Sequence, residues 1–287
     1  MNNLEKGASR KSVVLSIRAK KALFAIVGIT LALCTLFPVL WAIVSSFKPQ
    51  SELFSFPMTF FPKHWTLGNY FSTFRRGNFL VYFSNTIFVS VVSALITVVI
   101  NIMAGYALSK YIFPGREIIF GVMITTLMIP LQVIMIPIFL QLKNMGLLNS
   151  LWGIIIPPAA TPTGIFLARQ YLVTLPDSLI EASRIDGGNE FFIFTRIIFP
   201  LAKPVAATIA IFAFMWRWND YLWPLIVITK NNKQTIQQAL VTFVGQYQIN
   251  WSELLAMTTV AIIPIIIVFL SMQRFFMRGI TAGAVKG

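Results

Sequence analysis

Six long apolar stretches divide this sequence, and they limit the folds open to it. They span residues 22–46, 80–109, 118–142, 150–168, 204–228 and 254–273. A helix that crosses a bilayer needs about 20 mostly apolar residues, each adding about 1.5 Å of rise, so each stretch has the length of one crossing. Only the fifth stretch contains charged side chains, those of Arg217 and Asp220. The sequence therefore predicts an all-α membrane protein with six transmembrane helices.

The composition agrees with a membrane location and excludes several other classes. Apolar residues make up 57% of the chain and charged residues only 11%, whereas soluble domains carry about 25% charged residues. The single cysteine, Cys34, excludes a disulfide scaffold within the chain. The formal charge of +14 is spread between the apolar runs without forming a basic face. This pattern indicates basic loops at an anionic lipid surface and no nucleic-acid partner.

The distribution of Lys and Arg predicts which side of the membrane each segment faces. With the N-terminus inside, the cytoplasmic segments hold 15 of these residues and the outer segments hold 7. An excess of positive charge marks the cytoplasmic side, so both termini are predicted to be cytoplasmic. The first apolar run exceeds the roughly 7–15 residues of a signal peptide, and we expect it to be retained. The predicted parts are a basic N-terminus (1–21), a transmembrane domain (22–277) with a cytoplasmic loop (169–203), and a cytoplasmic tail (278–287).

The sequence lacks the motifs of a catalytic or nucleotide-binding site. No glycine is followed by lysine, which excludes the Gly-Lys-Ser/Thr P-loop that holds ATP phosphates. One cysteine and one histidine, His64, exclude the usual metal sites, and no Gly-x-Ser-x-Gly elbow occurs. We therefore expect no catalytic residue, metal or cofactor in this chain. The protein either conducts a solute passively or receives its energy from another subunit.

The charged residues of the fifth stretch form a candidate solute pathway. Arg217 lies about 20 Å along a helix that starts at residue 204, so it and Asp220 are near the outer end, where their spacing allows an ion pair on one helix face. Four aromatic residues surround them: Trp216, Trp218, Tyr221 and Trp223. One interpretation is an interfacial aromatic belt with a snorkelling ion pair. The other is the outer wall of a sugar pathway formed by Arg217, Asn219 and Asp220.

The cytoplasmic loop contains signals for two short helices. Ser178 and Glu181 predict a capping box that starts the first helix, and Gly187 suits the left-handed position that ends it. Asn189 can cap a second helix, which Pro200 interrupts. A helix of about two turns is marginal by itself in water, so the first helix must pack against something. It is either a lid on its own membrane domain or a knob that docks into another protein.

One pattern in this loop matches a known motif. The matching residues are Glu181-Ala182-Ser183, Gly187, Ile197 and Pro200. They resemble the EAA loop in the membrane subunits of binding-protein-dependent ABC importers, although Ser183 replaces the family's second alanine and Phe199 its leucine. Five further segments resemble the carbohydrate branch of these importers, which includes the G subunit of the maltose system: 85–86, 104–109, 128–130, 218–220 and 278–287.

The resemblance implies a type I ABC importer in a prokaryotic cell membrane. Its other parts would be a second, non-identical permease, two cytoplasmic ATPases that bind ATP and Mg²⁺, and an external solute-binding protein. In that family the EAA helix lies in a cleft of the ATPase, with its glutamate near an arginine, and the partner permease largely holds the sugar. The candidate ATPase-coupling residues of this chain are then Glu181, Ala182, Ser183, Asp186, Gly187 and Gly188.

Three functions remain open at this point. The leading hypothesis is a non-catalytic permease subunit of an ATP-driven importer that moves a carbohydrate into the cytoplasm. The alternative is a self-sufficient channel or facilitator for small polar solutes, which would need no ATPase. The third is a membrane enzyme, which the missing catalytic motifs disfavour.

Overall fold

The computed structural model describes residues 2–75, 78–245 and 249–284, and these residues form helices and no strands. The predicted all-α class is therefore confirmed. Contacts divide the chain into two compact units, one made of residues up to 71 together with 250–259, and the other made of 72–249 and the residues from 260 onward. Of the predicted tail, 278–287, the last three residues lie outside the described part. The predicted domain boundaries stay predictions.

The first unit contains a long helix and the loop that follows it. Its elements are α1 (Asn2–Ser45), α2 (Gln50–Leu53), the start of α3 (Gly68–Arg75) and the start of α15 (Trp251–Ala284). The Glu52 carboxylate accepts hydrogen bonds from the backbone N–H groups of Lys63 and His64, at 2.6 and 3.3 Å. The bond from Lys63 is the main reason why the pKa of Glu52 is lowered. The ionised Glu52 side chain therefore connects α2 to the backbone of residues 63 and 64.

The second unit contains the remaining helices. They are α4 (Phe79–Lys110), α5 (Arg116–Thr125), η1 (Thr126–Met128), α6 (Leu131–Asn144), α7 (Trp152–Ile155), α8 (Pro162–Val173), α9 (Ser178–Ile185), α10 (Glu190–Ile193), η2 (Phe194–Ile198, a π-turn), α11 (Phe199–Leu201), α12 (Lys203–Trp218), α13 (Leu222–Val227), η3 (Asn231–Lys233) and α14 (Ile236–Gly245). The later part of α15 also belongs to this unit.

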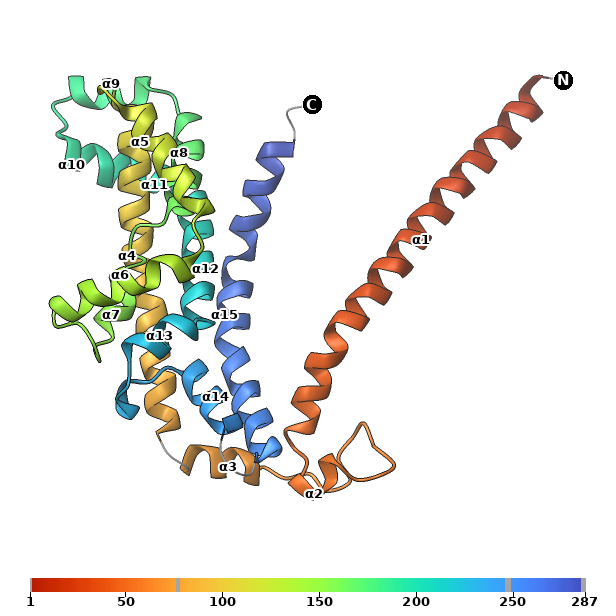
Figure 1. Cartoon of the computed structure of the whole chain (residues 1–287). Coiled ribbons are helices and arrows are strands. Elements are labelled where there is room, and N and C mark those ends of the chain that lie inside the picture. The colour runs from red at the N-terminus through yellow and green to blue at the C-terminus, as the bar shows by residue number, and fades with distance from the viewer. Residues whose placement is uncertain (1, 76–77, 246–248, 285–287) are drawn as a thin grey trace. The chain divides into compact units, whose positions relative to one another are not determined.

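Helix α4 is the centre of the second unit, and it packs mainly against α8 and α12 (Figure 1). A Cβ atom added at Gly105 would lie 2.5 Å from the Ala168 Cβ, so this glycine allows α4 and α8 to approach closely. One face of α4 carries small polar side chains at spacings of three and four residues, all of them buried: Thr86, Ser90, Ser93, Thr97 and Asn101. Small side chains at such spacings let neighbouring helices pack tightly in a membrane.

Helices of crossing length occur at some of the predicted places. Three in the described residues are long and apolar enough to span a membrane: Lys20–Ser45 within α1, α4, and Trp251–Gln273 within α15. Two more segments are sharply bent pairs, since α5 with η1 meets α6 at 107°, and the segment from α10 to α11 meets α12 at 79°. The count is three, or five if each bent pair is one crossing. The six-span arrangement stays a prediction.

The third predicted span, 118–142, is broken between two helices. Ile129 has an extended backbone (φ −83°, ψ 117°), because a residue before proline avoids the helical region. A proline inside a membrane-spanning helix is expected to kink it, whereas the structure has a full break at Pro130, with a bend of 107°. Pro137, in contrast, lies inside α6. The consequence of a proline therefore depends on the packing around it.

The fourth predicted span, 150–168, contains no helix of crossing length in this structure. Pro157 and Pro158 lie between α7 and α8, and neither has an N–H to continue the hydrogen-bond ladder. The Thr161 hydroxyl then caps α8 by accepting a hydrogen bond from the Gly164 N–H at 3.2 Å. Two adjacent prolines and a new N-cap thus divide this apolar stretch into two short helices.

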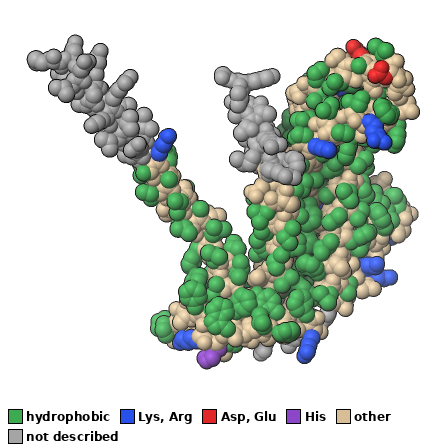
Figure 2. Space-filling model, turned by 180° about the vertical axis from the view of Figure 1, so that it is seen from behind, with side chains coloured by type: hydrophobic (Ala, Val, Ile, Leu, Met, Phe, Trp, Pro, Cys, Tyr) green, Lys and Arg blue, Asp and Glu red, His purple; other side chains and the backbone are tan. Residues whose placement is uncertain are grey.

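Hydrophobic side chains cover most of the face of the protein that Figure 2 shows. Large apolar side chains on α4, α5 and α6 are exposed in the isolated chain, including Leu95, Ile118 and Ile136 at 64%, 73% and 70%. Such exposure is unfavourable in water and is expected where lipid or another membrane subunit covers the surface. The Asp and Glu side chains visible in Figure 2 lie at one end of this face.

Candidate functional site: the α9 loop and the Arg217–Asp220 ion pair

Helix α9 begins at Ser178, one residue earlier than a capping box with Ser178 as its N-cap would require. Asp177 occupies the N-cap position, has a helical backbone (φ −69°, ψ −26°) and makes no side-chain capping bond. The chain already turns at this point, because the Ile180 N–H donates to the Asp177 carbonyl at 2.9 Å. Ser178 is therefore inside the helix, and the predicted Ser178–Glu181 capping box is wrong.

The end of α9 has the geometry that the glycine predicted. Gly187 has φ +84°, a conformation that glycine adopts without the steric cost of a Cβ atom. The Gly187 N–H donates to the Arg184 carbonyl at 3.1 Å, and the Gly188 N–H donates to the Ser183 carbonyl at 2.8 Å. These two bonds define a Schellman motif, which satisfies the last carbonyls of a helix. The predicted helix end at Gly187 is confirmed.

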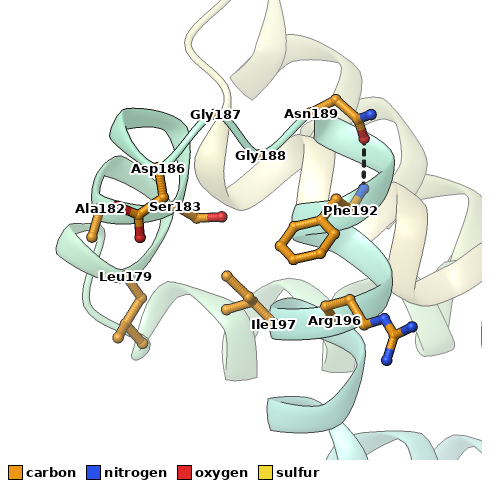
Figure 3. Close-up of a pocket in the computed structure, with 10 residues that line it drawn as sticks. All are labelled: Leu179, Ala182, Ser183, Asp186, Gly187, Gly188, Asn189, Phe192, Arg196 and Ile197. Carbon is orange, nitrogen blue, oxygen red and sulfur yellow. Dashed lines mark hydrogen bonds between the residues drawn. The ribbon is translucent and has the colours of Figure 1, made fainter.

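The second short helix also starts as predicted but ends differently. The Asn189 side-chain oxygen accepts a hydrogen bond from the Phe192 N–H at 2.8 Å (Figure 3), so Asn189 is the N-cap of α10. The helix continues through the η2 π-turn into α11, where Pro200 lies at the start of a new helical turn and needs no N–H partner. The sharp bend falls at Ala202 instead, just before α12.

A hollow of about 590 Å³ lies between these helices (Figure 3). Its walls come from α9 on one side and from α10 and η2 on the other, and the two glycines join the sides. The lining residues are Leu179, Ala182, Ser183, Asp186, Gly187, Gly188, Asn189, Phe192, Arg196 and Ile197. The hollow therefore brings together five of the six residues that the sequence assigned to ATPase coupling.

Glu181, the sixth of these residues, lies outside the hollow on the exposed face of α9. Ile180 and Ser183 are buried at 5% and 7% exposure and hold the opposite face of α9 against the rest of the second unit, whereas Ile185 is 86% exposed. Within the described residues, no side chain forms an ion pair or hydrogen bond with the Glu181 carboxylate. The exposed face of α9 thus combines a carboxylate without a partner and a large apolar side chain.

Sequence reasoning missed the residues that connect α9 to its surroundings. Glu190, the first residue of α10, forms an ion pair with Arg184 at 2.8 Å and accepts a hydrogen bond from the Tyr111 hydroxyl. The hydrogen bond to Glu190 raises the pKa of Arg184. The spacing of six residues between Arg184 and Glu190 across a glycine turn could have suggested this pair, but no sequence signal pointed to Tyr111.

The outer candidate site contains the ion pair that the sequence allowed. Arg217 Nη1 and Asp220 Oδ2 are 2.8 Å apart, and the side chains are only 15% and 11% exposed. The two residues do not share one helix face, because α12 ends at Trp218. Asp220 Oδ1 also accepts a hydrogen bond from the Trp223 N–H at 3.2 Å. Asp220 therefore joins the end of α12 to the start of α13.

The surrounding aromatic residues do not form a uniform interfacial belt. Trp218 is fully buried and its indole N–H donates to the Ala261 carbonyl at 3.0 Å. Trp223 is 3% exposed and donates to the Gly153 carbonyl at 3.1 Å. These two side chains belong to the core, whereas Trp216 is 47% exposed. The belt interpretation is therefore wrong for Trp218 and Trp223.

A small cavity of about 30 Å³ lies beside this ion pair. Its lining residues are Ser93, Thr97, Pro158, Thr161, Ala213, Trp216 and Arg217. Asn219 does not line this cavity, and its exposed side-chain amide donates to the Met215 carbonyl at 2.9 Å. The structure thus brings Arg217 and Asp220 together and leaves Asn219 at the end of α12.

A family model described as the inner membrane component of binding-protein-dependent transport systems matches residues 99–282. The matched range contains the loop 169–203, the hollow and the Arg217–Asp220 pair. The chain belongs to this family. It is therefore a membrane protein of a transport system that uses a solute-binding protein.

Curated relatives are similar over nearly the whole chain. The arabinooligosaccharides transport system permease protein AraQ of Halalkalibacterium halodurans is 37% identical, and the alignment covers 90% of this chain and 93% of AraQ. The diacetylchitobiose uptake system permease protein NgcG of Streptomyces coelicolor is 32% identical over 87% of this chain and 83% of NgcG. A chain in the crystal structure of a bacterial ABC transporter involved in the import of the acidic polysaccharide alginate is 28% identical, with a TM-score of 0.82 over 91% of this chain and 98% of that chain.

Proposed function

We propose that this membrane component is a permease subunit of an ATP-driven importer that moves a carbohydrate from an external solute-binding protein into the cytoplasm. Family membership and the names of its relatives, which transport arabinooligosaccharides and diacetylchitobiose, support the solute class. The observation that carries the proposal is α9, because its exposed face offers Glu181 and Ile185 to a partner. The chain itself is non-catalytic, and ATP and Mg²⁺ bind to two cytoplasmic ATPase subunits.

Coupling to the ATPase takes place at α9 and at the adjoining hollow. Glu181 pairs with a cation of the ATPase, while Ala182, Asp186 and the exposed Ile185 pack against its surface. Ser183 and Gly188 shape the contact from inside, since a Cβ atom at Gly188 would lie 2.7 Å from the Ser183 Oγ. A carboxylate that has no partner in the isolated chain gains a charge-assisted hydrogen bond when the complex forms.

The membrane arrangement that we propose has six spans, with both termini in the cytoplasm. The two bent pairs and the segment containing α7 and α8 add three spans to the three long helices, and the bias of Lys and Arg supports the orientation. A second, homologous permease covers the apolar surface of α5 and α6 to give a heterodimer. Cysteines placed at Lys63 and Asn232 in a Cys34→Ala background should then react with an impermeant reagent from outside. If a cysteine placed at Arg184 reacted and these two did not, the topology would be the inverse of the one proposed.

The solute pathway that we propose passes the outer end of α12. Arg217, Asn219 and Asp220 form its wall, together with the half-exposed ring of Trp216. Ser93, Thr97 and Thr161 supply hydroxyl groups in the adjacent cavity, and the Ser93 hydroxyl has no hydrogen-bond partner among the described residues. Hydroxyl groups next to an aromatic ring suit the polar edges and apolar faces of a sugar.

The decisive experiment is to express the chain with its genomic neighbours and purify the assembly through a tag on this chain. We expect an ATPase and a second permease to copurify, and we expect uptake into proteoliposomes to require ATP and the binding protein. The ligand of that binding protein identifies the carbohydrate. A stable homo-oligomer that transports the solute without an ATPase would contradict the proposal and establish a self-sufficient facilitator.

A further inference from the structure

The cytoplasmic end of α4 holds the segment around α9 from both sides. Before α9, the Lys110 ammonium lies 2.6 Å from Asp177 Oδ1 and donates to the Leu175 carbonyl at 2.5 Å. The Lys110 side chain is only 5% exposed, so its position is fixed by packing as well as by charge. After α9, Tyr106 and Tyr111 reach Glu190. In Figure 1, α9 lies near this end of α4.

Glu190 is the point where three elements meet. Its Oε1 atom accepts hydrogen bonds from Arg184 of α9, with the Arg184 Nε at 3.0 Å. Its Oε2 atom accepts from the Tyr111 hydroxyl and, at 3.4 Å, from the Tyr106 hydroxyl. The two tyrosine rings pack edge to face with centroids 5.3 Å apart, and the Arg184 guanidinium lies 5.9 Å from the Tyr111 ring centroid. We call Tyr106, Tyr111, Arg184 and Glu190 the Glu190 clamp.

A contact that only stabilised α9 would not need to reach α4. A helix of two turns depends on tertiary packing for its stability, and the buried residues Ile180 and Ser183 already supply this packing. The Glu190 clamp adds polar bonds between residues separated by more than 70 positions in the chain. Bonds to a carboxylate are shorter and stronger than neutral ones. They fix the distance and direction between α9 and α4.

We propose that Glu190 is a positioning residue that clamps α9 to the cytoplasmic end of α4, so that the two helices move as one rigid body during the transport cycle. This inference rests on the proposed contact between α9 and the ATPase. Displacement of α9 then moves α4, which packs along α8 and α12. Residues of α4 and α12 line the small cavity beside Arg217. Energetic coupling between distant sites needs such rigid, contiguous elements.

The test measures the distance between α9 and α4 in the complete transporter. Spin labels are placed at Met103 of α4 and Ser178 of α9, both exposed, in a Cys34→Ala background that removes the only cysteine. The distance distribution is recorded without nucleotide and after trapping with ATP and vanadate. We expect a narrow distribution that is the same in both states. A wild-type distance that changes between the states would overturn the proposal.

Variants of the clamp separate positioning from folding. Glu190→Ala should broaden the distribution and reduce the stimulation of ATP hydrolysis by the binding protein by about fivefold or more, the lower end of typical coupling factors. Glu190→Gln, which keeps the shape and an acceptor for Tyr111, should recover part of both losses. Tyr111→Phe removes one hydroxyl group and tests the clamp if Glu190→Ala fails to assemble. A distribution as narrow as wild type in Glu190→Ala and Tyr111→Phe, with full stimulation, would contradict the clamp.

The matched control is Glu117→Gln. Glu117 forms an ion pair with Arg169 at 2.9 Å, near the same end of α4, since Arg169 Nε also donates to the Leu108 carbonyl at 3.1 Å. Its carboxylate makes no ion pair or hydrogen bond with α9 or Glu190 in the described part of the chain. We expect the control to leave the distance and the stimulation unchanged. ATPase copurification distinguishes the two proposals: its loss from wild type would refute the docking of α9, whereas retention with an unchanged distance in the clamp variants would refute only the clamp.

Discussion

Segment 176–201, for which we propose a cytoplasmic location, and segment 216–224, for which we propose an outer location, each contain an arginine–carboxylate pair beside aromatic rings. These segments, called the cytoplasmic and the outer segment below, differ in exposure. The Arg184 and Glu190 side chains are 48% and 49% exposed, whereas those of Arg217 and Asp220 are 15% and 11% exposed. Desolvation makes a buried charge depend strongly on its partner, while an exposed pair contributes little to stability. The Arg217–Asp220 pair is therefore part of the folded core. The Arg184–Glu190 pair can instead serve in the joint movement of α9 and α4 that we propose.

The apolar side chains of the two segments follow the same division. Trp218 and Trp223 of the outer segment are buried and use their indole N–H groups within the fold. Ile185 and Phe191 of the cytoplasmic segment are 86% and 76% exposed. Large apolar groups exposed next to a cytoplasmic carboxylate are typical of a protein–protein contact. Substitutions in the outer segment should thus affect folding first, and those in the cytoplasmic segment should affect association first.

The largest effect is expected for Asp220→Ala. The substitution leaves the Arg217 guanidinium buried without its partner and removes the hydrogen bond from the Trp223 N–H, which should destabilise the protein by about 3–5 kcal/mol. The double variant Arg217→Ala/Asp220→Ala should be less damaged, because no unpaired charge remains. Thermal midpoints and monodisperse yield in detergent measure both. Equal losses in the single and double variants would show that the two side chains act independently.

Glu181→Ala should have its main effect on association. If Glu181 pairs with a cation of the ATPase, truncation costs about 2–5 kcal/mol, which is roughly a hundredfold or more in affinity at about 1.4 kcal/mol per decade. The thermal midpoint of the separate chain should not change, because the side chain is exposed and no described residue pairs with it. Copurification of the ATPase measures the effect. Ser178→Ala, an exposed position on the same helix, is the control and should retain the ATPase.

Gly187→Val tests the direction of α9 without removing a contact. A Cβ atom at this position would meet no other atom within 4 Å, so the cost comes only from the positive φ of +84° and should be about 1–3 kcal/mol. The strain should be relieved by a local change at the end of α9, which weakens ATPase copurification. Gly187→Asn is the control, because asparagine tolerates the left-handed conformation better. Equal behaviour of both variants would exclude backbone geometry as the cause.

Local features of the fold could be predicted from the sequence. The apolar runs indicated helices in a membrane, and the turn at Gly187 and the cap at Asn189 were correct because each depends on residues within a few positions. The start of α9 was wrong by one residue because Asp177 already had a helical conformation. A capping motif describes a preference, and the tertiary contact of Asp177 with Lys110 competes with it.

Features that join distant parts of the chain could not be predicted. Glu190 meets Tyr111 across 79 positions, and nothing near either residue indicates the other. A window of apolar residues also measures length and not continuity, so it could not distinguish Pro130, where the chain breaks, from Pro137, which lies inside α6. Similarly, the aromatic group near Arg217 was visible in the sequence, but the burial of Trp218 depends on α15.

A small loss of stability is expected for Arg184→Ala. Its pair with Glu190 is half exposed, and such pairs contribute about 0.2–1 kcal/mol, so the thermal midpoint should change far less than in Asp220→Ala. The hydrogen bond to Glu190 raises the pKa of Arg184; the arginine therefore stays protonated as the pH rises, and its contribution should not vary between about pH 6 and 9. A double-mutant cycle with Glu190→Ala measures the pairing energy. A loss as large as that of Asp220→Ala would place the cytoplasmic pair in the folded core and remove the contrast between the two segments.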